Sequence, residues 1–180
     1  MTTFKTYYDS PIGTLLLTSD GASLTGLYIG TSKHKTEMGD IWIRDDDALP
    51  FAETKRQIAA YFAGELTEFT LPLAPRGTVY QQRVWDELTR IPYGVTCSYG
   101  ELARRIGQPK GSRAVGMANG RNPISIIIPC HRIVGASGKL TGYSGGLARK
   151  ESLLKLEQNA HTVVLKADIM KDLYKIRDTI

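Results

Sequence analysis

The chemistry in this sequence is concentrated where a thiol, an imidazole and a guanidinium follow one another, at Cys130, His131 and Arg132. A thiolate is a strong nucleophile, and cationic neighbours can lower the pKa of a cysteine below about 8.5. The triplet therefore predicts a nucleophilic cysteine. A buried structural cysteine with a capping histidine is one alternative. A cysteine hydrolase, in which Glu157 orients His131 as in a catalytic triad, is another.

The residues before the thiol predict a rigid support for it. Positions 126–128 are three isoleucines, which favour a short buried strand, and Pro129 ends the strand because proline donates no backbone hydrogen bond. Cys130 is thus expected at a strand end. Successive residues of a strand point to opposite faces, so Cys130 and His131 can act together only if the chain turns between them or a water bridges them.

Upstream of the thiol, the sequence predicts a helix-turn-helix. Residues 98–106 have a helical pattern, residues 107–111 form a glycine-containing turn, and Ser112 caps a second helix that runs to about residue 119. In a DNA-binding motif of this kind the second helix lies in a groove. The small residues of the second helix would let it approach the DNA groove closely. An ordinary αα-hairpin is the alternative. Five basic residues favour DNA binding: Arg104, Arg105, Lys110, Arg113 and Arg121.

Three other segments flank the candidate nucleophile. A capping box starts a helix at residue 78 and an apolar stripe continues it. Residues 133–142 predict a strand and a glycine-containing hairpin turn, and residues 143–146 predict a loop whose backbone can lie flat against a ligand. A helix over residues 147–158 carries Glu157 near its end, where the acid is either a solvated surface residue or a partner of His131.

The fold class expected is α+β, with a small N-terminal lobe of antiparallel sheet and helix followed by a mostly helical DNA-binding and active-site domain. Strands are predicted at residues 4–8, 14–18 and 24–29, a polar loop at 31–47 and a helix at 50–63. Residues 1–72 form the N-terminal lobe, 73–160 the helix-turn-helix and active-site domain, and 161–180 a C-terminal extension. That extension is expected to hold a strand at 163–165 and a basic amphipathic helix.

The charge of the chain is divided unevenly. Residues 1–75 hold 6 basic and 10 acidic side chains, whereas residues 76–180 hold 17 basic and 8 acidic ones. A basic second half is expected to bind a polyanion, because neutralising phosphates releases counterions. A basic surface that merely keeps the protein soluble is the alternative.

Several classes of protein do not fit the composition. The sequence has no run of about 18 apolar residues, so no membrane span is expected, and no secretory signal is visible, so the cytoplasm is the expected compartment. With only two cysteines, no disulfide framework is expected. The three scattered histidines have no zinc-ligand spacing, so neither metal nor cofactor is expected. Cys97, with no charged residue next to it in the sequence, is expected to pack in the core.

The motifs together resemble a known family, the O6-alkylguanine-DNA alkyltransferases or methylated-DNA–protein-cysteine methyltransferases. The resemblance runs from about residue 77 to residue 157. It rests on Pro-Cys-His-Arg at 129–132, Asn-Pro at 122–123 and Gly-Tyr-Ser-Gly-Gly at 142–146, and on matching segments at 81–85, 91–94, 98–99 and 113–116. The first lobe, starting at residues 9–13, also resembles the family's N-terminal domain, with weaker motifs.

The resemblance implies a DNA repair protein that flips an alkylated guanine out of the duplex and moves its O6-alkyl group irreversibly onto Cys130. His131 would take the thiol proton through a bridging water, and Glu157 would hold His131 in the required tautomer. Asn122 would brace the turn before the active site, and Tyr99 would help to rotate the base and donate a hydrogen bond to it.

Other positions would bind the substrate. Arg113 would occupy the gap left by the flipped nucleotide, Ser144 would lie near O6, and Tyr143 would form a wall of the pocket. The remaining expected DNA contacts are Ser98, Ala114, Gly116 and Ala118. The partner implied is double-stranded DNA containing O6-alkylguanine, bound by a protein that is a monomer in solution, with cooperative assembly on DNA left open.

Two features distinguish this sequence from some members of the family. Some members carry a zinc site in the first lobe, but this lobe has His34 and no cysteine, so that site is not expected. Members that bind alkylated DNA without repairing it replace the nucleophile, whereas Cys130 is present. A non-catalytic sensor of alkylated DNA, or a helix-turn-helix regulator, is the alternative function.

Overall fold

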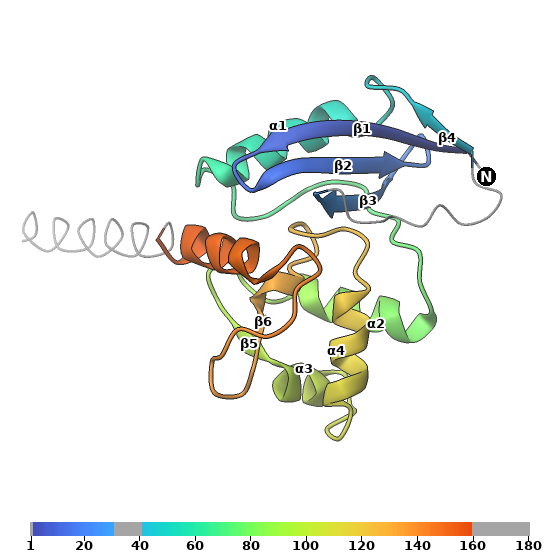
Figure 1. Ribbon diagram of the computed structural model, residues 1–180. Helices are drawn as coiled ribbons and strands as arrows, with labels where there is room; N and C mark the ends of the chain where they lie inside the picture. Colours follow the sequence, from blue (N-terminus) through green and yellow to red (C-terminus); the bar gives the residue numbers. More distant parts are fainter. Residues whose placement is uncertain (1, 31–40, 160–180) are drawn as a thin grey trace, which may run out of the picture.

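The structure is a computed structural model that describes residues 2–30 and 41–159 (Figure 1). The first half of the chain forms a four-stranded sheet in the order β3-β2-β1-β4. β1 pairs with β2 and β2 with β3 in antiparallel fashion, which confirms the three predicted strands. The strands are β1 (Thr2–Ser10), β2 (Gly13–Ser19), β3 (Leu24–Ile29) and β4 (Ile41–Arg44).

The strand β4 was not predicted, because residues 31–47 read as a polar loop. Its four residues run parallel to β1, with Thr2 opposite Ile41 and Lys5 opposite Arg44. An edge strand of four residues is too short to show a clear alternation of apolar and polar side chains in the sequence. The prediction of a loop is therefore wrong for residues 41–44.

The helix α1 (Phe51–Phe62) packs on one face of the sheet, as predicted for residues 50–63. Phe51 and Ile58 of this helix belong to the same buried cluster as Leu15 and Leu17 of β2. Residues 15 and 17 share a face of the strand because side chains alternate. Figure 1 shows the sheet and α1 together in the upper part of the molecule.

The second half is mostly helical, so the α+β fold class is confirmed. A two-stranded parallel sheet joins β5 to β6 and brings the start of α3 next to the segment that follows Cys130. A further helix covers residues 147–159. The other elements are α2 (Val79–Thr89), β5 (Cys97–Ser98), α3 (Tyr99–Arg105), α4 (Ser112–Gly120), the 3-10 helix η1 (Cys130–Arg132) and β6 (Ile133–Val134).

Two helix starts were predicted from capping residues, with different outcomes. The capping box at α2 is present, since Thr78 accepts a hydrogen bond from the Gln81 amide and the Gln81 side chain accepts one from the Thr78 amide. At α4 the N-cap is Gly111 and no side chain caps the helix, so the predicted capping role of Ser112 is wrong. Ser112 is instead the first residue of the helix.

The strand predicted at residues 126–128 is absent, and a turn takes its place. Ile126 has a positive φ of 72°, and the Ile128 amide donates to the Ile124 carbonyl at 3.0 Å. The three isoleucines are buried all the same. Apolar runs report burial more reliably than they report strand, because a turn held by other bonds can bury them too. Cys130 consequently begins a 3-10 turn.

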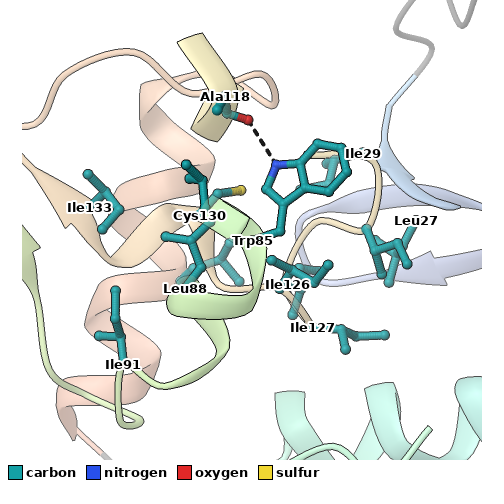
Figure 2. Packing of buried hydrophobic residues seen from close by; sticks show 14 of the residues in the cluster. Leu27, Ile29, Trp85, Leu88, Ile91, Ala118, Ile126, Ile127, Cys130 and Ile133 are labelled. Atoms are coloured by element: carbon teal, nitrogen blue, oxygen red, sulfur yellow. Dashed lines mark hydrogen bonds between the residues drawn. The ribbon is translucent and has the colours of Figure 1, made fainter. Parts of the chain in front are cut away.

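The two halves of the molecule share one hydrophobic core and backbone hydrogen bonds. The Leu27 amide of β3 donates to the Pro123 carbonyl at 2.8 Å, and the Ser125 amide donates to the Leu27 carbonyl at 2.9 Å. Figure 2 shows Leu27, Trp85 and Cys130 in the buried cluster. The first lobe therefore packs directly against the turn that leads to Cys130.

Four predictions concern residues outside those the structure describes. They are the part of the polar loop at 31–40, His34 within it, the strand at 163–165 and the amphipathic helix that follows that strand. Within residues 2–30 and 41–159, no helix is long and apolar enough to cross a membrane.

Candidate active site

The turn that presents Cys130 is held by two asparagine side chains. Asn122 donates from Nδ2 to the Ile128 carbonyl at 2.8 Å and accepts from the Ile124 amide at 3.0 Å. Asn119 donates to the Cys130 carbonyl at 3.4 Å. A side chain that bonds both ends of a turn fixes its shape. The bracing expected of Asn122 thus has the hydrogen bonds it needs, and Asn119 was missed.

The Cys130 side chain is buried, and burial raises the pKa of its thiol. A hydrogen bond with Asn122 and the positive charge of Lys150 act in the opposite direction without reversing this rise. The expected lowering of the pKa by Arg132 is wrong, because its guanidinium points to Glu157. The raised pKa favours the neutral thiol, so a nucleophilic Cys130 would need a base.

His131 is placed to be that base. Its Nε2 atom lies 2.8 Å from Oε1 of Glu157, and both side chains are fully buried. A carboxylate only accepts, so Nε2 carries the proton and Nδ1 of the neutral ring carries the lone pair. Nδ1 has no hydrogen-bond partner in the part of the chain that the structure describes. Burial lowers the pKa of His131, which keeps the ring neutral and able to accept a proton.

Glu157 is surrounded by donors. Arg132 bonds both carboxylate oxygens, from Nε at 2.9 Å and from Nη2 at 3.0 Å, and the Gly94 amide donates to Oε2 at 3.1 Å. Tyr61 of α1 donates to Oε1 at 2.8 Å. Burial alone would raise the pKa of Glu157, but the hydrogen bonds and charges of His131 and Arg132 hold it well below its usual range.

Lys150 was also missed by sequence reasoning. It is fully buried and donates from Nζ to the Thr141 carbonyl at 2.9 Å and to the Ile133 carbonyl. Because residues 147–159 form one helix, this lysine ties the helix that carries Glu157 to β6 and to the loop at residue 141. Its charge also favours the thiolate of Cys130.

Three residues expected to bind the substrate are Tyr99, Tyr143 and Ser144. Tyr99 accepts a hydrogen bond from the Thr141 hydroxyl at 3.1 Å, and its ring faces Gly116 of α4. The Tyr143 hydroxyl is buried and has no hydrogen bond within the described residues. Burial and the neighbouring Cys130 raise the pKa of Tyr143 well above its usual value.

A cavity of about 300 Å³ opens between β3 and the active-site turn. Ser144 lies on its wall with Asn122 and Ser125. The Asn122 and Ser125 side chains also interact with the Cys130 thiol. The cavity therefore shares two wall residues with the surroundings of the Cys130 thiol.

The helix-turn-helix presents one exposed face of α4. Arg113 and Ala114 are exposed, and Met117, which sequence reasoning did not single out, is 62% exposed. Ala118 is buried, and its carbonyl accepts a hydrogen bond from Trp85 Nε1 at 2.9 Å (Figure 2). Ala118 therefore packs in the core of this structure, and its expected contact with DNA stays a prediction.

The remaining predicted contact, Ser98, lies at the start of α3. Its hydroxyl accepts a hydrogen bond from the Glu101 amide at 3.1 Å, which makes Ser98 the N-cap of that helix. In the part of the chain that the structure describes, no group of three or more histidine, cysteine or acidic side chains is arranged to hold a metal ion.

Comparison with known families gives two matches that together span most of the chain. Residues 3–75 match the ribonuclease-like domain of 6-O-methylguanine DNA methyltransferase, and residues 79–159 match the DNA binding domain of the same family. The similarity thus covers both halves of the fold, and includes the triplet at residues 130–132.

Relatives and solved structures agree with this match. A methylated-DNA–protein-cysteine methyltransferase of Methanosarcina acetivorans is 54% identical over 150 residues, which cover 83% of this chain and 95% of the relative. The crystal structure of Mycobacterium tuberculosis OGT in complex with DNA is 52% identical, with a TM-score of 0.80 over 89% of this chain and 94% of that one. An enzyme of Pyrococcus kodakaraensis shares the fold at 22% identity, with a TM-score of 0.62 over 86% of this chain and 98% of that one.

Proposed function

The chain belongs to the 6-O-methylguanine DNA methyltransferase family, and we propose that it repairs DNA by moving the O6-alkyl group of guanine onto Sγ of Cys130. The observation that carries this proposal is the buried series formed by Cys130, His131 and Glu157. The thiol is neutral, the imidazole Nδ1 can accept a proton, and the carboxylate fixes the tautomer of the ring. A methyl group is the simplest group transferred.

The reaction balances as a displacement at carbon. His131 Nδ1 takes the proton of the Cys130 thiol through a bridging water, and the sulfur lone pair attacks the alkyl carbon. The S–C bond forms as the C–O6 bond breaks, and its electron pair leaves with the guanine. Tyr99 and Ser144 supply hydrogen-bond donors to the departing base. The product is a thioether, which no group in the described site can cleave, so each molecule reacts once.

The burial of Cys130 requires the target base to leave the duplex. A side chain that is 2% exposed cannot reach an atom inside the base stack, so the nucleotide must rotate into the protein. Arg113, exposed near the start of α4, occupies the gap that is left. Tyr143 forms a wall of the pocket.

The DNA contacts follow from the exposed face of α4 and its surroundings. Ala114 and Gly116 are small enough to let α4 lie close to the DNA groove. Ser98, at the start of α3, contacts the DNA backbone. The relative from Mycobacterium tuberculosis was solved in complex with DNA, and the basic second half of this chain suits the same partner. Together these features favour duplex DNA containing O6-alkylguanine as the substrate.

A matched pair of cysteine variants tests the proposal. Cys130→Ala is expected to abolish the loss of methyl from a duplex containing O6-methylguanine and to retain binding to that duplex. Cys97→Ala, which removes the other buried thiol, is expected to transfer methyl at the rate of the unmodified protein. Methyl loss that persists in Cys130→Ala would overturn the mechanism. Tight binding by a wild-type protein that removes no methyl would point instead to a damage sensor.

A further inference from the structure

The Glu157 carboxylate is held partly by the N-terminal lobe. Among the donors that the structure describes, His131, Arg132 and Gly94 belong to the second half, whereas Tyr61 belongs to α1. Tyr61 and Glu157 are 96 residues apart in the chain, and their oxygens are 2.8 Å apart. The first lobe thus donates a hydrogen bond to the carboxylate that orients His131.

The oxygen that Tyr61 contacts is the one that matters for His131. Oε1 of Glu157 accepts from the Tyr61 hydroxyl at 2.8 Å and lies 2.8 Å from His131 Nε2. Arg132 Nη2 also donates to this oxygen, at 3.0 Å. Donors to one oxygen share its electron density, so each affects how strongly the others are held. Tyr61 therefore acts on the orientation and basicity of His131 through a single shared atom.

The Tyr61 side chain is rigidly placed. It is fully buried, and its ring centroid lies 5.4 Å from that of Phe69 and 5.9 Å from that of Tyr93, with an interplanar angle of 82° to Tyr93. Aromatic pairs of this kind fix ring position. Burial and the Glu157 charge also raise the pKa of Tyr61 well above its usual value, which keeps the hydroxyl protonated as a donor.

We infer that Tyr61 of the N-terminal lobe is a positioning residue for alkyl transfer, which sets the orientation and proton affinity of His131 through Glu157. This inference rests on the proposed function. It makes the first lobe a working part of the reaction, because α1 supplies one of the bonds that fix the carboxylate.

The expected direction of the effect follows from charge. A Tyr61→Phe variant keeps the ring and loses the O–H donor, so more negative charge remains on Oε1. The imidazolium form of His131 is then better stabilised, and the pKa of His131 rises. The other charged groups near His131 are Arg132 and Lys150, which disfavour the imidazolium and are unchanged by the substitution. Tyr93, which also lies near Glu157, keeps its own hydroxyl.

The test compares Tyr61→Phe with a matched control, Tyr93→Phe. Tyr93 is a buried neighbour whose hydroxyl makes no hydrogen bond in the part of the chain that the structure describes. Single-turnover methyl transfer is measured against pH for both variants and the wild type. We expect Tyr61→Phe to lower the rate about tenfold, as for loss of a hydrogen bond to a charged group. Its half-maximal rate should move to higher pH. Tyr93→Phe should follow the wild type.

A second measurement does not depend on turnover. ¹⁵N chemical shifts of the histidine rings, assigned with His34→Gln and His161→Gln variants, report the tautomer and pKa of His131 directly. We expect a higher pKa of His131 in Tyr61→Phe than in wild type or Tyr93→Phe. An unchanged pH midpoint and unchanged ¹⁵N titration would overturn the inference, even if the rate fell. A wild type that transfers no methyl would refute the proposed function, while the ¹⁵N titration would still decide the role of Tyr61.

Discussion

Nε2 of His131 and Oε1 of Glu157 lie 2.8 Å apart with both side chains fully buried. This contact leaves Nδ1 as the basic nitrogen of the ring, because the carboxylate can only accept the Nε2 proton. In the proposed mechanism, reaction therefore depends on the tautomer of this buried histidine. The site therefore resembles a nucleophile, base and orienting acid, with the acid bonded to five protein donors.

Replacing the acid by its amide tests the orientation of His131. In Glu157→Gln the amide N–H₂ can donate to Nε2, which favours the tautomer with the proton on Nδ1 and removes the base. We expect the single-turnover rate to fall by about 10²- to 10⁴-fold, as when an orienting carboxylate is amidated in a triad. Stopped reactions with duplex in excess measure this rate. A rate equal to that of the wild type would exclude the orienting role.

The same substitution needs a stability control, because it also removes the partner of Arg132. Arg132 is 6% exposed and would be left without its ion pair. Breaking a buried pair on one side costs about 3–5 kcal/mol. Rates are therefore compared on samples whose urea unfolding shows a fully folded protein at the assay temperature.

Acid unfolding should depend on Glu157. Its pKa in the folded protein is held below the usual value of about 4.3, so the stabilisation is complete above that pH and is lost as the pH falls toward the folded pKa. We expect the free energy of unfolding of the wild type to decrease from about pH 4.5 downward more steeply than that of Glu157→Gln. Urea titrations at a series of pH values measure both slopes. Parallel slopes would contradict a depressed pKa of Glu157.

If Arg113 occupies the gap left by the flipped nucleotide, its removal should lower the transfer rate on some substrates and not on others. Arg113→Ala should slow transfer from duplex DNA by at least about tenfold but leave reaction with free O6-methylguanine nearly unchanged, since only the duplex offers stacking to overcome. Arg56→Ala, which removes an exposed arginine paired with Glu53 on α1, is the control for lost positive charge. An equal fall in the transfer rate of Arg113→Ala on both substrates would refute this role of Arg113.

Cys97 is expected to be chemically silent. It is buried as predicted, and α3 brings the Glu101 carboxylate beside it although no charged residue is next to Cys97 in the sequence. Burial and Glu101 raise the pKa of Cys97 to about 11. We expect iodoacetamide at pH 8 to leave Cys97 unlabelled in the folded protein and to label it in urea. Rapid labelling of folded Cys97 would contradict this pKa.

The predictable parts of this fold are those encoded locally. The capping box at Thr78 and the glycine-containing turn between α3 and α4 follow from a few neighbouring residues. The triplet at 130–132 indicated the proposed nucleophile by residue type alone. The pairing of the Arg132 guanidinium with Glu157 could not be predicted from the sequence, because it depends on the tertiary fold.

The parts that were missed depend on contacts between distant segments. Tyr61 reads as one apolar position of an amphipathic helix, and nothing in its neighbours indicates a carboxylate from residue 157. Ile126 has the side chain of a strand residue, but the side chain of Asn122 and the pairing with β3 hold its segment in a turn. Local propensity yields to such tertiary bonds.

The most direct test of the account is mass spectrometry of the intact protein and its peptides after incubation with excess duplex containing O6-methylguanine. The account predicts one added methyl group per molecule, located on Cys130, with no further increase at longer times. A protein that binds the lesion and gains no methyl, that gains it on another residue, or that removes more than one methyl per molecule would contradict it.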